Sequence, residues 1–173
     1  TASGAFEPGE VTVDFWPDMS EADVDEKYAT PFFHKDGSLA TVFSSANIKT
    51  VNRHFKWMND YGIDGVFFQQ FASNLRSNNP KGRANALVVF DNIIAGAKAN
   101  NNRLVSIMYD LSGSNATGTM INDIKQHWQE MANKHGVNDN TKEYVLTYQQ
   151  KPVVAIWGVG FNRTDNYDLD DIA

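Results

Sequence analysis

The chain contains no cysteine, and this absence removes several kinds of chemistry at once. Without thiols there is no disulfide bond, no thiolate zinc site and no cysteine nucleophile. A large packed core is stable without disulfides, so the absence says little about the cellular compartment.

Long apolar runs and an excess of positive charge are also missing. No segment approaches the roughly 18 apolar residues of a membrane-spanning helix, and residues 1–9 lack the basic start and apolar stretch of a signal peptide. The chain has 15 basic and 21 acidic residues and a net charge of −6, so no positive field attracts phosphates. We therefore expect neither a membrane nor a nucleic acid as a partner.

Several catalytic and cofactor motifs are incomplete. Gly158 and Gly160 follow an apolar run as in a dinucleotide fingerprint, but Arg163 stands where the third glycine belongs. Residues 113–119 have the glycine spacing of a phosphate loop and lack its lysine. The four histidines form no pair with metal-ligand spacing, and no serine lies in a nucleophile elbow. We therefore expect no cofactor, no metal and no acyl-hydrolase chemistry.

Apolar residues make up 42% of the 173 residues, enough for a packed core. Ile48, Val51, Phe55 and Met58 have helical spacing, and Gly62 is a helix stop. The same spacing predicts helices over residues 87–97 and 121–131, the last with its stop at Gly136. Short apolar runs at residues 66–71, 104–109 and 153–157 predict strands. This alternation predicts an α/β fold with a parallel sheet covered on both sides.

Residues 1–45 do not follow this rhythm. Pro8, Pro17, Pro31 and a stretch rich in Ser, Asp and Glu predict a long ordered loop, with a possible short strand at residues 11–15. Long loops in compact α/β domains tend to be functional. Residues 137–151 are expected to be irregular or to form a short helix.

The number of strand–helix units bears on the architecture. A (β/α)₈ barrel needs about 250 residues, whereas residues 1–173 contain three clear units and form one domain. The acidic stretch at residues 167–173 is typical of the first turn of a further helix. We expect a TIM-barrel type of fold of which about the first half is present.

Ligands of parallel α/β sheets bind at the carboxyl ends of the strands. Amides, a carboxylate and aromatic residues follow the predicted strands, and this mixture suits a polyhydroxylated ligand. Aromatic residues also fill cores, and a carboxylate after a strand can cap a helix or brace a loop. Together with residues of the long loop, the candidate substrate-binding residues are Trp16, Asp18, His34, Gln69, Gln70, Asp110, Trp157 and Phe161. One side chain of the Gln69–Gln70 pair should point into the core and the other into the pocket.

Three segments, residues 54–68, 106–113 and 151–161, resemble the front half of the glycoside hydrolase family 71 and 99-like proteins. The family includes endo-α-mannosidases, fungal α-1,3-glucanases and many members called xylosidase or arabinosidase. The similarity runs in order over about residues 9–173, and residues 11–18 are similar to the loop after the first barrel strand. In this sequence Gln70 stands where many relatives carry arginine in a Gln-Arg-Phe phrase.

The resemblance implies a (β/α)₈ barrel with its sugar site at the carboxyl face. It also implies that the catalytic carboxylate pair lies beyond the fourth strand, outside this segment, and that the first strand precedes Thr1. The segment alone is therefore expected to be inactive. The remaining half of the barrel, or another chain, is the expected partner at the sheet edges.

Three functions remain open at this point. The first is part of a secreted or periplasmic glycoside hydrolase acting on a poly- or oligosaccharide by carboxylate acid/base catalysis. The sequons at Asn115 and Asn162 permit glycosylation on a eukaryotic secretory route. The second is a carbohydrate-binding protein on a degenerate barrel. The third is a self-contained flavodoxin-like binding domain.

Overall fold

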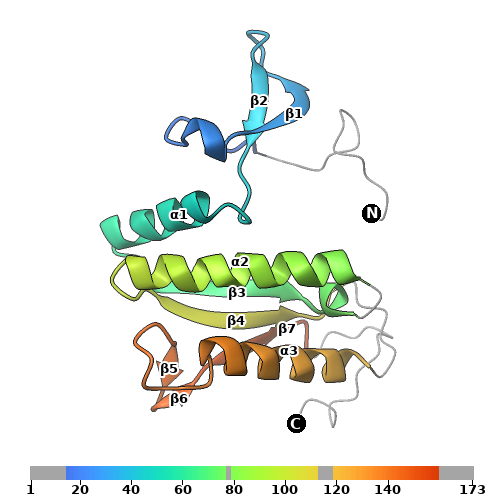
Figure 1. The fold of residues 1–173 in the computed structure, drawn as a ribbon, viewed down its shortest axis with the longest axis vertical. Coiled ribbons are helices and arrows are strands. Elements are labelled where there is room, and N and C mark those ends of the chain that lie inside the picture. The colour runs from blue at the N-terminus through green and yellow to red at the C-terminus, as the bar shows by residue number, and fades with distance from the viewer. Residues whose placement is uncertain (1–14, 77–78, 113–118, 160–173) are drawn as a thin grey trace.

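A computed structural model describes residues 15–76, 79–112 and 119–159. The chain is mixed α/β, with a parallel sheet, three α-helices and two antiparallel hairpins in this part (Figure 1). In chain order the elements are η1 (Val24–Glu26), β1 (Tyr28–Phe33), β2 (Leu39–Val42), α1 (Ile48–Asp60), β3 (Gly65–Phe71), η2 (Ala72–Leu75), α2 (Pro80–Ala99), β4 (Leu104–Asp110), α3 (Met120–His135), β5 (Thr147–Tyr148), β6 (Lys151–Pro152) and β7 (Val154–Trp157). None of these described helices is long and apolar enough to cross a bilayer.

The helix ends follow from local chemistry. The Asn47 side chain caps α1 by accepting a hydrogen bond from the Lys49 amide. The Asn79 side chain caps α2 by accepting one from the Gly82 amide. Gly62, just after α1, and Gly136, at the end of α3, have φ angles of 71° and 65°. Glycine adopts this left-handed region without steric cost, so both predicted stops are confirmed.

The parallel sheet has the order β3-β4-β7, so its strands pair in the order in which the chain makes them. The three predicted strands and their parallel direction are confirmed. The sheet begins at Gly65, where an added Cβ would lie 2.0 Å from the Leu104 carbonyl oxygen. Only glycine fits there.

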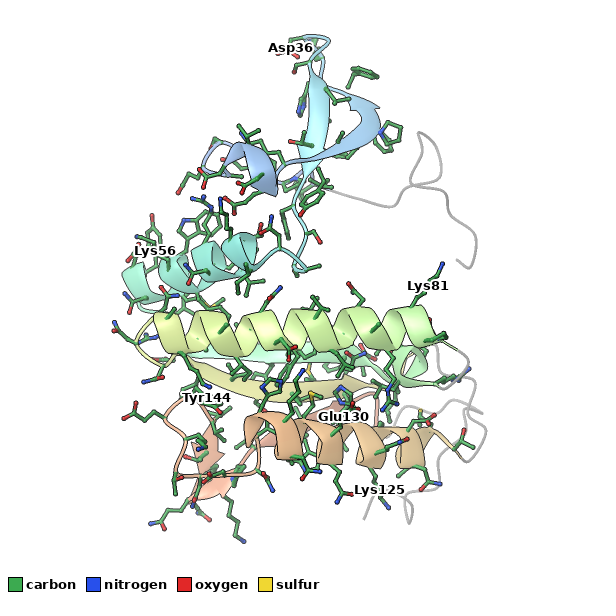
Figure 2. The ribbon with its side chains drawn as sticks, in the orientation of Figure 1. Asp36, Lys56, Lys81, Lys125, Glu130 and Tyr144 are labelled. Carbon is green, nitrogen blue, oxygen red and sulfur yellow. The ribbon has the colours of Figure 1, made fainter. Side chains whose placement is uncertain are left out.

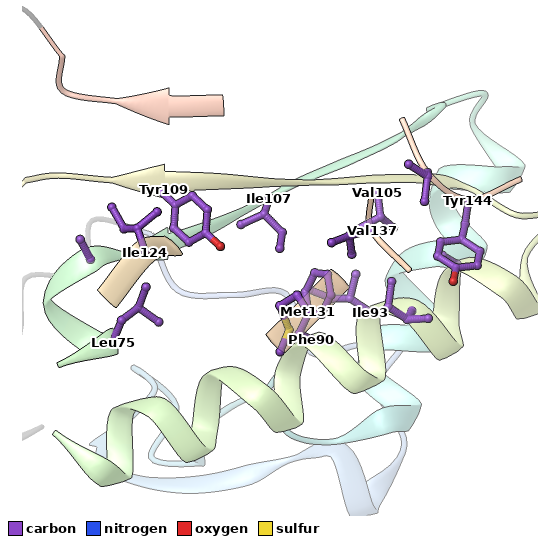
Figure 3. Close-up of a cluster of buried hydrophobic side chains, with 14 of the residues drawn as sticks. Leu75, Phe90, Ile93, Val105, Ile107, Tyr109, Ile124, Met131, Val137 and Tyr144 are labelled. Atoms are coloured by element: carbon purple, nitrogen blue, oxygen red, sulfur yellow. The ribbon is translucent and has the colours of Figure 1, made fainter. Parts of the chain in front are cut away.

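The described helices do not cover both sheet faces, so that expectation is wrong for this part of the chain. Val105, Ile107 and Tyr109 point from β4 toward α2 and form the core with residues of α3 (Figure 3). On β3, by contrast, Phe67 and Phe71 are exposed. Successive strand residues point to opposite faces, so these two belong to a second face that we call the open face.

The expected long loop at residues 1–45 contains a hairpin, because β1 and β2 pair antiparallel. Its turn includes Asp36 and Gly37, and Gly37 has a φ angle of 83°. Of the possible strand at residues 11–15, residues 11–14 lie outside the described residues. Residues 137–151 form turns and the start of the small β5–β6 hairpin rather than a helix.

The segment from η1 to β2 lies against α1, on the side away from the sheet (Figure 1). Arg53 of α1 holds the buried Glu26 carboxylate, with Nη2 2.5 Å from Oε2. The His54 ring stacks on Trp57 and meets Phe43 edge-on. An ion pair and an aromatic group therefore join this segment to the helical layer.

Candidate functional site

The carboxyl edge of the sheet brings side chains of three strands together. Phe71, Asp110 and Trp157 pair in register across β3, β4 and β7. Paired residues of parallel strands point to the same face, and neighbouring strands lie about 4.8 Å apart. Asp110 is therefore flanked by two aromatic residues on the open face.

The Asp110 carboxylate is fixed by hydrogen bonds to both of its oxygens. Gln69 donates from Nε2 to Oδ2 at 2.5 Å, and the Ser112 amide donates to Oδ1 at 2.8 Å. The second bond forms the turn that leads the chain out of β4. The loop-bracing role considered for Asp110 is thus present, at the same edge where the candidate site was expected. Only 3% of Asp110 is exposed.

The two flanking aromatic side chains remain accessible, at 41% exposure for Phe71 and 53% for Trp157. The Trp157 carbonyl accepts a hydrogen bond from the Leu111 amide at 3.0 Å, which ties the ends of β7 and β4 together. Exposed aromatic faces stack on the C–H faces of sugar rings, and a carboxylate accepts hydrogen bonds from hydroxyl groups. The edge therefore presents chemical groups that suit a polyhydroxylated ligand.

Gln70 lies on the opposite face of β3 from Gln69. It is 3% exposed, and its Nε2 donates to the Phe71 carbonyl at 3.1 Å. Gln69 is exposed and holds Asp110. As predicted, one side chain of the pair is buried and the other is exposed on the opposite face of the strand; that one of them lines a binding pocket stays a prediction.

The structure does not bring Trp16 or His34 to this edge. Trp16 packs on Phe32 and donates from Nε1 to the Thr41 carbonyl at 3.0 Å, so it belongs to the hairpin. His34 starts the hairpin turn, where its amide donates to the Ser38 carbonyl at 2.8 Å. Figure 2 shows Asp36 of the same turn at the tip of the hairpin, far from the sheet. The hairpin carries both residues away from the expected cleft.

Asp18 lies at a different hollow, of about 170 Å³, between the segment before β1 and helix α1. Hydrogen bonds from Ser20 lower the pKa of Asp18. Glu26 and Arg53 line the same hollow, and the Arg53 hydrogen bonds lower the pKa of Glu26 from 4.5 to about 2. Because the Glu26 carboxylate and the Arg53 guanidinium pair with each other, their role at this hollow is to hold two segments of the fold together.

The last candidate residue, Phe161, lies outside the described residues.

The sequence interpretation omitted Phe71 and Ser112 from the site. Period-2 alternation could have found Phe71, which lies two residues after Gln69 and therefore shares its face. Within the described part of the chain, no cluster of three or more His, Asp or Glu residues could hold a metal ion. A carboxylate, an amide and two aromatic rings thus define this edge.

Comparison with known proteins gave no match to a family model, to a curated protein or to a solved structure.

Proposed function

We propose that this chain forms part of the sugar-binding wall of a glycoside hydrolase. One observation carries the proposal: Asp110, held by Gln69, lies between the exposed rings of Phe71 and Trp157 at the carboxyl edge of a parallel sheet. Asp110 would accept hydrogen bonds from sugar hydroxyls while the rings stack on the sugar. The substrate would be a poly- or oligosaccharide outside the cell or in the periplasm.

The proposal also includes a catalytic pair of carboxyl groups, which we do not assign to residues 1–173. Hydrolysis of a glycosidic bond uses two carboxyl groups, one as acid and one as base or nucleophile. In our proposal both come from residues outside the segment. Asp110 then contributes to binding and positioning.

A (β/α)₈ barrel is the architecture we propose for the domain of which residues 1–173 would form part. Support comes from the strand order, which follows the chain, and from the packing of α2 and α3 on one face. In a barrel the opposite face lines the interior, as Phe67, Phe71 and Trp157 would do. The partly exposed Val154 and Ile156 of the edge strand β7 leave room for a further covering element. The remaining half of the barrel, or another chain, would supply it.

The test uses the protein at its full natural length, assayed on a panel of α-linked oligo- and polysaccharides. Asp110→Asn should lower kcat/KM about tenfold to a hundredfold, the loss of a charged hydrogen bond of about 1.5–3 kcal/mol. Trp157→Ala should mainly raise KM. Asp64→Asn is the matched control, because Asp64 precedes β3 at the other edge of the sheet. Absence of glycan hydrolysis and binding, or an Asp110→Asn variant equal to wild type, would overturn the proposal.

A carbohydrate-binding protein on a degenerate barrel is the second candidate. It is favoured by Gln70, a neutral amide where the resembled family often has arginine. Binding of glycans without hydrolysis in the same panel would select it. A flavodoxin-like domain has helices on both faces of its sheet, and the exposed open face does not favour that alternative.

A further inference from the structure

A second hollow, of about 250 Å³, adjoins the candidate site. Its polar lining consists of Ser45, Gln69, Gln70, Asn74 and Asn85. It lies between the carboxyl end of β3 and the first turns of α2. Gln69 belongs to both places, since the same side chain holds Asp110. Gln69 therefore links this hollow to Asp110.

The lining contains four amides and a hydroxyl and no charged side chain. An amide donates and accepts hydrogen bonds, as a pair of neighbouring sugar hydroxyls does. No side chain of the wall carries the charge that would pair with a phosphate, carboxylate or ammonium group. The chemistry therefore selects an uncharged, hydroxyl-rich ligand.

Gln70 gives an independent indication that something binds there. Its side chain is 97% buried, and its one hydrogen bond to the described residues runs from Nε2 to the Phe71 carbonyl. Its Oε1 atom is left without a protein partner in this part of the chain. A ligand hydroxyl that reaches this oxygen could donate a hydrogen bond to it.

We propose that this amide-lined hollow binds one neutral sugar unit, adjacent to the unit held at Asp110. The assignment of the ligand as sugar rests on the proposed function. The volume lies below the about 300–1,000 Å³ of sites for drug-sized ligands, which fits a single ring. Phe68 and Val89 also line the hollow and offer apolar contact to the C–H groups of the ring.

The experiment measures binding by calorimetry with the full-length protein. The probes are neutral disaccharides, the trisaccharides that extend them by one unit, and uronic-acid trisaccharides. Asn85→Ala changes an exposed helical side chain, and Gln70→Leu removes the buried amide. Asn133→Ala, an exposed helical residue of α3, is the matched control.

Asn85→Ala and Gln70→Leu should each weaken binding of neutral trisaccharides about tenfold and leave disaccharide binding unchanged. Asp110→Asn should weaken the binding of disaccharides and of trisaccharides. If Asn85→Ala binds trisaccharides like wild type while Asp110→Asn is impaired, the hollow is not a subsite and the proposed function stands. If uronic-acid trisaccharides bind equally well and depend on Asn85, the neutral assignment is wrong. If no glycan binds at all, the proposed function itself fails.

Discussion

The Glu26–Arg53 pair shows how a single ionic contact can hold a segment in place. Glu26 is 1% exposed, and both oxygens accept hydrogen bonds from the Arg53 guanidinium. Oε2 also accepts a bond from the Asp23 amide at 2.9 Å. Since Arg53 lies in α1 and Glu26 in η1, the pair links the hairpin segment to the helical layer.

Arg53→Ala should reduce the free energy of unfolding by about 3–5 kcal/mol, because it leaves a buried carboxylate without its partner. Urea unfolding followed by circular dichroism measures the loss. Lys49→Ala is the control, since Lys49 pairs with Asp25 at the surface and should change stability little. Equal effects of the two substitutions would contradict the assigned role.

Acid should remove the contribution of Glu26 to the free energy of unfolding over a defined pH range. Its folded pKa of about 2 lies below the ordinary value of 4.5. The stabilisation is therefore fully present above pH 4.5 and is lost as the pH falls from 4.5 toward 2. The unfolding free energy of Glu26→Gln should fall less over this range than that of wild type.

His127 and Tyr109 form a second buried pair, in the core between α3 and β4. The Tyr109 hydroxyl lies 2.8 Å from Nδ1 of His127, which has no exposed surface. Burial lowers the pKa of His127 from 6.5 to about 4 and raises the pKa of Tyr109. The folded state therefore disfavours the protonated imidazole.

The free energy of unfolding should fall as the pH drops from 6.5 toward 4. In this range His127 is protonated in the unfolded chain but stays neutral in the folded chain. Tyr109→Phe should cost about 1–3 kcal/mol at neutral pH, since it leaves a buried nitrogen without its partner. Adding His127→Phe should restore most of this loss and flatten the pH dependence. Urea titrations across this range test both points, and an unchanged slope in the double variant would refute them.

The site residues differ in how well the sequence predicts them. Gln69, Asp110 and Trp157 could be predicted because they end apolar runs, and parallel strands bring such ends together. Trp16 and His34 could not, because the path of their segment depends on contacts distant in sequence. The bond from Trp16 to Thr41, for example, leaves no periodic signal.

Among the elements, the helices and parallel strands could be predicted because burial imposes a period on their side chains. The β1–β2 hairpin could not be predicted this way, since Pro31 and the exposed residues of β1 hide its alternation. The pair Asp36-Gly37 was the available signal, because Asp-Gly favours tight hairpin turns.

The approach of β3 to β4 yields a prediction at the scale of elements. In Gly65→Ala the new methyl group would meet the Leu104 carbonyl oxygen, a backbone atom that no rotamer change can move. We expect a loss of about 1–3 kcal/mol or more, as for overpacked cores. In the comparison variant Gly82→Ala the three atoms nearest to the methyl group all belong to the Asn79 side chain, the N-cap of α2, which can shift without moving the sheet backbone. Thermal melts of the two variants should therefore differ, and equal melting temperatures would contradict the packing argument.

At the scale of the whole molecule, the open face is the surface for which we expect a partner. Phe67, Phe71 and Trp157 are each at least 41% exposed on it. Contiguous apolar surfaces of this kind mark interfaces or promote aggregation. We expect residues 1–173 expressed alone to bind a hydrophobic dye and self-associate, and Phe67→Thr to reduce both. A monomeric wild-type chain without dye binding, active on α-linked oligosaccharides, would favour a self-contained domain.

The order β3-β4-β7 also has a consequence for biosynthesis. Each strand pairs with the strand made before it, so the sheet can grow from one side as the chain leaves the ribosome. At about 5–20 residues per second, translation allows each helix to form before the next strand appears. No strand has to wait for a later segment to be inserted between it and its neighbour. Vectorial synthesis and sheet assembly can therefore proceed in the same direction.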